Sequence, residues 1–270
     1  MRRVLLGAAL VAAVGAVVLA RSWGPREPEP FPDTAVESVP PPELAAAAGE
    51  RVFLGHMSIG WNMLGGLEQL YDEQGVARPA IVQVAPGEPP PELPAEGGAI
   101  VHAEIGTNGD PLGKIANFDA TMRAGMADVV DVALVKLCYT DVTAKTDVDA
   151  VFAAYRSTMD ALERDHPDVR FLHTTVPLTA APSGIKQHLK VAVRGDDNAA
   201  RERYNALVRE AYGDDDLFDI AAAEGTGADG VRTASLATGW ADGDREHLNQ
   251  AGSAMLAARF LDVLTQTEDG

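Results

Sequence analysis

Short apolar runs alternate with segments of helical periodicity along most of the chain. The apolar runs typical of buried strands cover residues 51–55, 80–85, 99–105, 131–139, 169–175 and 217–220. Between several of them, apolar residues recur every three or four positions, which predicts helices over 61–71, 148–164, 198–212 and 249–264. Strands that alternate with helices predict an α/β fold, with a parallel sheet of about five strands covered on both faces.

The first twenty residues follow a different pattern. Arg2 and Arg3 precede an unbroken run of apolar and glycine residues at 4–20, and Arg21 follows it. Positive charge before an apolar core is typical of an export signal, and this run is intermediate between a signal-peptide core and a membrane span of about 20 residues. We expect 1–20 to be a signal peptide or an N-terminal membrane anchor. An uncleaved anchor is favoured because no polar stretch separates the run from a cleavage point.

Residues 21–50 are rich in proline, glutamate and aspartate. Proline removes backbone donors and favours the polyproline II conformation, so this segment is predicted to be an extended spacer. A second proline-rich patch, at 86–94, predicts a surface loop. The remaining residues, 51–270, suit one domain of ordinary size. The N-terminal segment would place that domain outside the cytoplasm, either secreted or anchored to the membrane.

Charge and cysteine content exclude several classes of function. The chain carries 22 basic and 40 acidic residues, so its formal net charge is −18. A surface this acidic repels phosphate backbones, which excludes a nucleic-acid partner. Cys138 is the single cysteine, so an intramolecular disulfide and a thiolate-rich zinc or iron–sulfur site are excluded as well. We expect neither a metal nor a cofactor.

Ligands of parallel α/β sheets bind beyond the carboxyl ends of the strands, so the segments that follow strands are the candidates for chemistry. The first of these is GHMSIG at 55–60, which places Ser58 in a glycine-flanked turn between a predicted strand and a helix. Such a turn exposes a hydroxyl and supplies a backbone N–H at a helix start, where anionic oxygen is stabilised. Taken alone, the commoner role of a serine here is to cap the helix.

The second candidate is DREHLN at 244–249, directly before the last predicted helix. An acid three residues before a histidine lets the Asp244 carboxylate reach Nδ1 of His247 while Nε2 faces outward. That arrangement orients a general base. A surface histidine among acidic neighbours is the alternative that the sequence leaves open.

The third candidate is GTNGDP at 106–111, which also follows a strand. Its glycines allow unusual backbone angles and bring N–H groups close to a ligand oxygen. The Gly113–Lys114 pair downstream is not a phosphate-binding loop, because Asn108 stands where the first glycine is required and Ile115 replaces the serine or threonine. An ordinary turn at the end of a strand is the alternative.

Together, these segments resemble the conserved blocks of the SGNH/GDSL hydrolase superfamily. GHMS at 55–58 is similar to the first block, with His-Met where the family usually has an aspartate before the serine. NGD at 108–110 resembles the second block, LCYTD at 137–141 falls where the third belongs, and DREHLN at 244–249 matches the last. The resemblance covers about 51–264, in the right order. It implies a flavodoxin-like three-layer α/β/α sandwich and ester hydrolysis without a cofactor.

The resemblance also implies roles for individual residues. Ser58 would be the nucleophile, His247 the general base and Asp244 the acid that orients it. The backbone N–H groups of Ser58 and Gly109 would form the oxyanion hole.

One departure from the family concerns the oxyanion hole. Thr140 stands where the family has an asparagine whose side chain donates to the oxyanion, and the loss of one donor costs roughly 2.7–4 kcal/mol. The Thr140 hydroxyl or Asn108 could replace it. Asp141 is expected to contact substrate, while His56 either contacts substrate or stacks beneath the Ser58 loop.

The leading hypothesis is an exported or membrane-anchored serine esterase that hydrolyses small acyl esters, such as acetyl esters, of a small molecule or a glycan. One alternative is a catalytically inactive domain of the same fold that binds cell-envelope glycan or a partner protein. Another is an acyltransferase that uses the same residues and a sugar hydroxyl in place of water.

Overall fold

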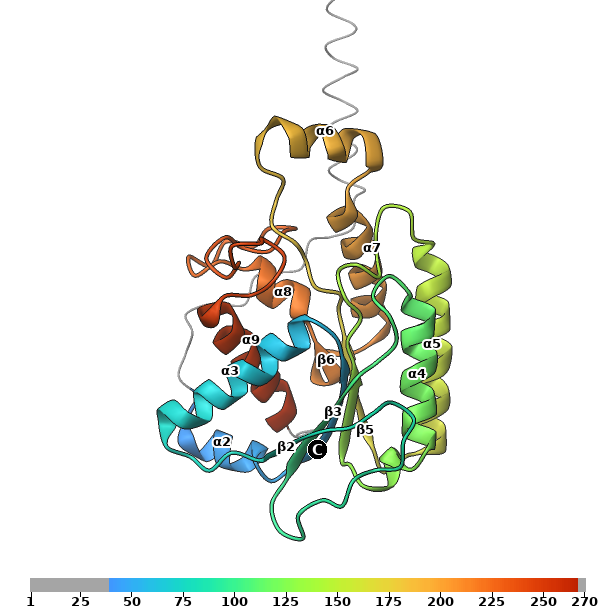
Figure 1. The fold of residues 1–270 in the computed structure, drawn as a ribbon, viewed down its shortest axis with the longest axis vertical. Helices are drawn as coiled ribbons and strands as arrows, with labels where there is room; N and C mark the ends of the chain where they lie inside the picture. Colours follow the sequence, from blue (N-terminus) through green and yellow to red (C-terminus); the bar gives the residue numbers. More distant parts are fainter. Residues whose placement is uncertain (1–38, 267–270) are drawn as a thin grey trace, which may run out of the picture.

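The computed structural model describes residues 39–266, which form one parallel β-sheet with helices on both faces (Figure 1). The six strands lie in the order β2-β3-β1-β4-β5-β6, and every neighbouring pair is parallel. The α/β fold predicted from the sequence is confirmed, with six strands in place of about five. The strands are β1 (Arg51–His56), β2 (Ala80–Gln83), β3 (Ala99–Glu104), β4 (Val132–Val135), β5 (Arg170–Thr174) and β6 (Leu217–Phe218).

The strand order places a switch point at β1. From β1 the chain forms β2 and β3 on one side, and it then crosses to β4, β5 and β6 on the other. Without the edge strand β2, the other five strands have the flavodoxin-like order 2-1-3-4-5. Proteins of this kind bind ligands at the switch point, beyond the carboxyl ends of the strands. The segments that follow β1, β3 and β4 are therefore the expected place for a site.

Two layers of helices enclose the sheet. The layer that contains α3 and α9 covers one face of the sheet, and the layer that contains α4 and α5 covers the other (Figure 1). The first layer contains α2 (Pro41–Ala47), α3 (Ile59–Gln74), α8 (Ile220–Gly225) and α9 (Gln250–Thr265). The second contains α4 (Pro111–Arg123), α5 (Val148–Asp165) and α7 (Asp197–Ala211). Helix α6 (Gly184–Arg194) stands apart from both layers. Two short 3-10 helices lie at Met126–Asp128 and Asp214–Asp216.

The alternation of side chains along β1 joins the two layers through the sheet. Phe53 points to the α4 side and stacks on Phe118, with ring centroids 5.9 Å apart. Val52 and Leu54 point to the other side and belong to the core beneath α3 and α9. Because β1 is buried on both faces, its sequence is a nearly continuous apolar run and not an alternating one.

The four helices predicted from periodicity are present as α3, α5, α7 and α9, each within a turn of its expected bounds. Asn249 caps α9 as expected, since its side chain accepts from the Gly252 N–H. Four further helices, α2, α4, α6 and α8, were not predicted. The expected strand at 217–220 is wrong at its end, because Asp219 accepts from the Ala222 N–H and begins α8.

The prediction of an extended spacer over 21–50 is wrong for its last part, where Pro41–Ala47 forms helix α2. Prolines are well tolerated in the first turn of a helix, where their fixed φ suits the helix and the missing N–H is not needed. Leu44 is fully buried in the core next to α9, and the Tyr71 hydroxyl donates to the Leu44 carbonyl at 2.9 Å. The spacer prediction failed because it was based on proline content and ignored the helix-forming ELAAA that follows.

The predicted signal or anchor at 4–20 and the spacer up to residue 38 lie outside the described residues. Within residues 39–266, no helix is both long and apolar enough to cross a bilayer.

Two adjacent glycines of α3 provide a test of how closely α3 packs on α9. A Cβ at Gly66 would lie 2.1 Å from the Ser253 carbonyl oxygen, whereas a Cβ at Gly65 would meet nothing within 4 Å. We expect Gly66→Ala to lower the free energy of unfolding by about 1–3 kcal/mol through overpacking. The matched control Gly65→Ala should raise it by roughly 0.5–1 kcal/mol through helix propensity. Urea unfolding measures both, and equal effects of the two variants would contradict the close packing.

Candidate active site

Ser58 occupies the turn between β1 and α3, at the switch point of the sheet. Its φ of 53° lies in the left-handed region, which a non-glycine residue adopts rarely and at a cost of about 1–3 kcal/mol. Ser58 stands at the N-cap position of α3, yet its side chain makes no capping hydrogen bond. The hydroxyl is therefore available to another partner, and helix capping by the side chain is not its role.

His247 and Asp244 approach Ser58 from the loop that precedes α9. Ser58 Oγ lies 2.5 Å from His247 Nε2, and His247 Nδ1 lies 2.5 Å from Asp244 Oδ2. The Asp242 N–H donates to the His247 carbonyl at 2.8 Å and closes the loop. The structure thus brings together, in one line, the three side chains that the sequence motifs selected.

Hydrogen bonds hold Asp244 in its ionised form. Its Oδ1 accepts from the backbone N–H groups of Glu246 and His247, and its Oδ2 pairs with the His247 ring. These bonds, led by the one from Glu246, lower the pKa of Asp244 to about 2. An ionised Asp244 favours the tautomer of His247 that carries its proton on Nδ1, so that Nε2 can accept from the Ser58 hydroxyl.

His56 lies beneath the Ser58 turn and is fully buried. Its Nε2 is 3.0 Å from His102 Nδ1, and the Trp61 ring packs edge-on against both imidazoles. Burial, and to a lesser extent Lys136, lowers the pKa of His56 to about 3, so the ring is neutral. A substrate contact for His56 is contradicted, because its ring is fully buried and packs closely against Gly60 in the first turn of α3. Within residues 39–266, no group of three His, Cys, Asp or Glu side chains is placed to hold a metal ion.

Asp141 is a buried anchor for the loops that follow β3 and β4. Its Oδ1 accepts from the Gly109 N–H at 2.7 Å, and its Oδ2 accepts from the Cys138 N–H at 2.5 Å. The same Oδ2 lies 2.7 Å from Lys114 Nζ, and neither side chain of this ion pair is exposed. The expected substrate contact of Asp141 is therefore contradicted, because protein groups enclose its carboxylate.

The expected oxyanion-hole donors do not all remain free. The Gly109 N–H is donated to the anchor carboxylate, which contradicts its role as an unoccupied donor. Asn108 Oδ1 accepts from Lys114 Nζ at 2.8 Å, and its amide Nδ2 has no acceptor within the described chain. Thr140 Oγ1 is buried and has no hydrogen-bond partner among residues 39–266. The remaining candidates are the Ser58 N–H, the Asn108 amide and the Thr140 hydroxyl.

Sequence reasoning missed two residues that shape this site. The Tyr139 ring packs edge-on against His247, with centroids 5.8 Å apart, and its hydroxyl donates to Glu246 at 2.9 Å. Its position inside the third motif was a usable signal. Lys114 gave no such signal, because lysine is almost never fully buried and its patterning is that of a surface residue.

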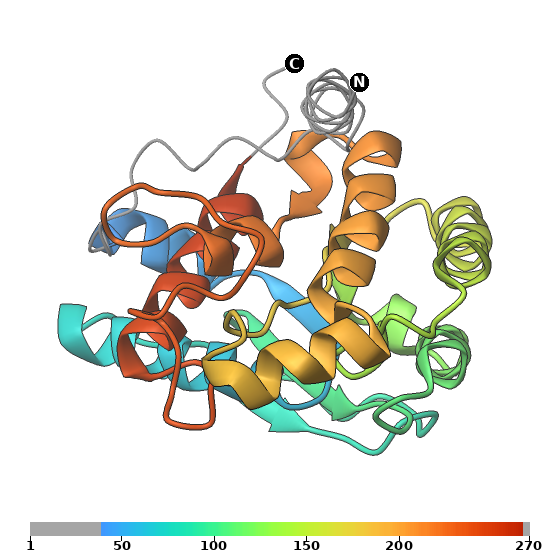
Figure 2. The ribbon, with the colours of Figure 1, turned by 90° about the horizontal axis from the view of Figure 1, so that it is seen from above.

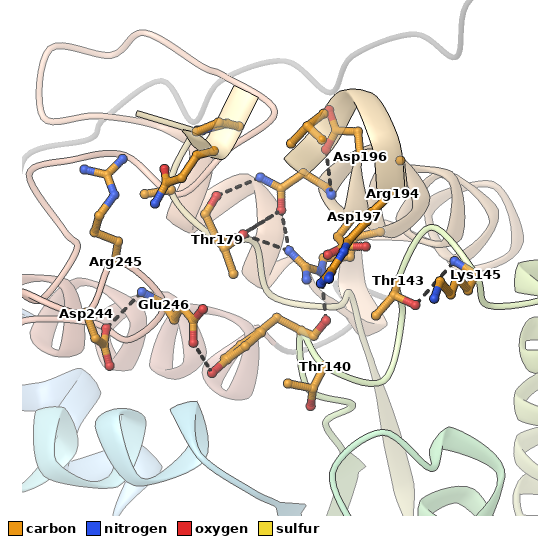
Figure 3. A pocket seen from close by; sticks show the side chains of 18 residues that line it. Thr140, Thr143, Lys145, Thr179, Arg194, Asp196, Asp197, Asp244, Arg245 and Glu246 are labelled. Atoms are coloured by element: carbon orange, nitrogen blue, oxygen red, sulfur yellow. Dashed lines mark hydrogen bonds between the residues drawn. The ribbon is translucent and has the colours of Figure 1, made fainter. Parts of the chain in front are cut away.

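A cavity of about 490 Å³ lies beside the triad (Figure 3). Asp244, Arg245 and Glu246 lie on one side of it, and Thr140 lies near its lower end in this view. Ser58 and His247 are not among its lining residues, so the cavity adjoins the reacting atoms without containing them. Its other side is lined largely by polar and charged residues, which include Thr143, Lys145, Arg194, Asp196 and Asp197.

The buried ion pair provides a test of the anchor. Asp141→Asn leaves the Lys114 ammonium buried without its counter-charge, and we expect the free energy of unfolding to fall by about 3–5 kcal/mol. The exposed pair between Arg78 and Glu68 is a matched control, and Glu68→Gln should change the stability by only about 0–1 kcal/mol. Urea unfolding measures both, and a loss for Asp141→Asn as small as the control's would show that this carboxylate does not anchor the loops.

Comparison with known proteins shows similarity in structure and not in sequence. The sequence matches no family model and no curated protein. Among solved structures, a Streptococcus pneumonia protein whose name refers to platelet activating factor is 14% identical, with a TM-score of 0.51 over 80% of this chain and 83% of that one. At this identity, the similarity is one of fold.

Two further solved structures are similar at lower TM-scores. A Desulfitobacterium hafniense DCB-2 protein, named for the G-D-S-L family of lipolytic proteins, is 12% identical with a TM-score of 0.45, over 79% of this chain and 99% of its own. A peptidoglycan O-acetylesterase is 12% identical with a TM-score of 0.41, over 63% of this chain and 47% of its own. At these identities and TM-scores, neither structure adds to what the Streptococcus pneumonia protein shows, which is a likeness of fold.

Proposed function

We propose that this chain is a serine ester hydrolase in which Ser58 is the nucleophile, His247 the general base and Asp244 the acid that orients it. The observation that carries the proposal is the line of short contacts from Ser58 Oγ to His247 and from His247 to Asp244. Two features support it. The Ser58 backbone is strained, and strain of this kind clusters at functional sites. The line also lies at the switch point of the sheet, where ligands of such folds bind.

The proposed reaction proceeds through an acyl-enzyme. The Ser58 hydroxyl attacks the ester carbonyl carbon as its proton passes to His247 Nε2. The tetrahedral intermediate collapses, the carbon–oxygen bond to the alcohol breaks, and the alcohol leaves with the proton from His247. Water then attacks the acyl-enzyme, again with His247 as the base, and releases the acid and free Ser58.

The negative charge of the intermediate needs hydrogen-bond donors that are not already engaged. The Ser58 N–H stands at the start of α3, where backbone donors and the helix dipole favour anionic oxygen. The Asn108 amide and the Thr140 hydroxyl are the side chains proposed to complete the hole, since neither donor has a protein acceptor in the described chain.

The proposed substrate is a small acyl ester carried by a polyhydroxyl compound such as a glycan. The cavity beside the triad supports this class, because Asp244 is one of its lining residues and the others offer many hydrogen-bond donors and acceptors. We also propose that the enzyme acts outside the cytoplasm. That part rests on Arg2, Arg3 and the apolar run at 4–20.

A non-catalytic binding domain is the second candidate function. The occupied Gly109 N–H and the threonine at position 140 favour it, because both reduce the donors available to an oxyanion. The intact line of Ser58, His247 and Asp244 favours the hydrolase, since a binding domain has no need of a strained serine that contacts a histidine. An acyltransferase would use the same residues and differ only in the acceptor.

The triad is tested with a fluorophosphonate probe and a small aryl acetate. Ser58→Ala should abolish labelling, and His247→Ala should lower hydrolysis by about 10⁴-fold or more, because nucleophile and base act as a unit. Asp244→Asn should cost less, since nucleophile and base remain. Because the pKa of Asp244 is lowered to about 2, its own protonation should not reduce the activity until the pH falls to about that value, which a pH–rate profile measures.

Ser157→Ala is the matched control, since Ser157 is exposed on α5, and it should label as the wild type does. Unfolding curves establish that each variant is folded. Wild-type protein that is folded, does not react with the probe and hydrolyses no simple ester would overturn the hydrolase in favour of the binding domain.

The oxyanion hole is tested at position 140. Thr140→Asn restores an amide donor and should raise the turnover of the aryl acetate, by up to about the 10²-fold that one such donor contributes. Thr140→Val removes the hydroxyl at nearly constant shape and should lower turnover. If both folded variants keep the wild-type rate, residue 140 is not part of the oxyanion hole.

A further inference from the structure

Helix α6 has a strongly two-sided sequence. Ile185, Leu189 and Val193 recur every four residues, so they lie along one stripe of the helix. The basic residues of the helix are Lys186, Lys190 and Arg194, and it contains no aspartate or glutamate. A short amphipathic helix of this composition is typical of segments that lie in the interface of a membrane.

The structure leaves this apolar stripe uncovered. Ile185 is 80% exposed, Leu189 59% and Val193 83%, the largest exposures among the large apolar residues of the described chain. The opposite side of α6 is the one that faces protein, since Gln187, Val191 and Arg194 line the cavity beside the triad. Figures 1 and 2 show α6 lying across the end of the molecule, away from both helix layers. The helix therefore turns its apolar side outward.

The charge of α6 is opposite to that of the rest of the chain. The whole chain carries a formal net charge of −18, whereas α6 carries only basic charges. The acidic residues that follow it, Asp196 and Asp197, are engaged elsewhere: Asp196 caps α7, and Asp197 accepts from the Ala144 N–H. An apolar stripe on a basic helix fits a surface that is apolar inside and anionic outside.

We propose that α6 docks this domain onto an anionic lipid bilayer, with Ile185, Leu189 and Val193 buried among the headgroups and acyl chains. A second copy of the chain fits this face poorly, because two α6 helices would bring like charges together. Docking would hold the cavity and the triad next to the membrane surface, since α6 follows β5 and therefore lies at the carboxyl edge of the sheet, where Ser58 follows β1. The proposal does not depend on the hydrolase activity, because it rests on α6 alone.

The test follows a fluorescent probe on α6 of the full chain. Cys138 is buried, so Val193→Cys provides a single reactive thiol for an environment-sensitive dye. The matched control is Asp168→Cys, an exposed position before β5 at the opposite edge of the sheet. With phosphatidylglycerol vesicles, emission at position 193 should shift to the blue and be quenched by spin-labelled lipid. It should not respond to phosphatidylcholine vesicles at the same lipid concentration, and position 168 should respond to neither.

Charge reversal gives the second arm. Lys186→Glu with Lys190→Glu should weaken the response of the Val193→Cys probe to phosphatidylglycerol vesicles tenfold or more, since each basic residue near an anionic surface adds to binding. An equal response to both lipids, or no response to either, would overturn the proposal. A probe that is shielded before any lipid is added would also overturn it, because the stripe would then be covered by protein.

Discussion

The edge of the sheet that carries the candidate active site depends on the ion pair and the hydrogen bonds of the buried Asp141 carboxylate. It is fully enclosed, so its charge must be compensated inside the protein, and Lys114 provides that compensation from α4. Its two oxygens also bind the N–H groups of Gly109 and Cys138, which lie in the loops after β3 and β4. Cys138 Sγ in turn lies 3.6 Å from the Met57 carbonyl, beside Ser58. One buried acid thereby sets the spacing of the three loops that meet at the switch point.

Close packing also fixes the path of the turn that carries Ser58. A Cβ at Gly60 would lie 2.2 Å from His56 Nδ1, so the first turn of α3 can pass over the buried imidazole only because residue 60 is glycine. His56 is fixed by His102 and Trp61, and it is neutral because burial opposes its protonation. The positive φ of Ser58 persists because Cys138 and His56, which contact the turn just before and just after Ser58, fix the path of the backbone. The hydroxyl that faces His247 is thus placed by the core of the protein.

The parts of this structure that the sequence predicted are those whose signal is local. The alternation of apolar runs and helical periods predicted the parallel sheet, and the spacing of Asp244 and His247 predicted their contact. The partner of the Gly109 N–H could not be predicted, because it is a carboxylate 32 positions away that looks like a surface residue. Helix α2 was not predicted, because the prolines at its start, considered alone, indicate an extended segment. Helix α6 was not predicted either, since its apolar stripe is too short to stand out beside the apolar runs of the core.

In the proposed hydrolase, the stability of the loops and the oxyanion hole would compete for the same backbone donor. A peptide N–H is one donor, and here that of Gly109 is given to the carboxylate that holds the loops together. The threonine at position 140 removes a second donor of the family pattern, so the oxyanion would be held by Ser58 N–H with help from Asn108 and Thr140 side chains. One donor contributes about 2.7–4 kcal/mol to such a transition state. An amide, whose leaving group is poor, needs that stabilisation more than an ester does. For the proposed hydrolase, this arrangement is therefore expected to suit esters, with an alcohol as the leaving group, better than peptide bonds.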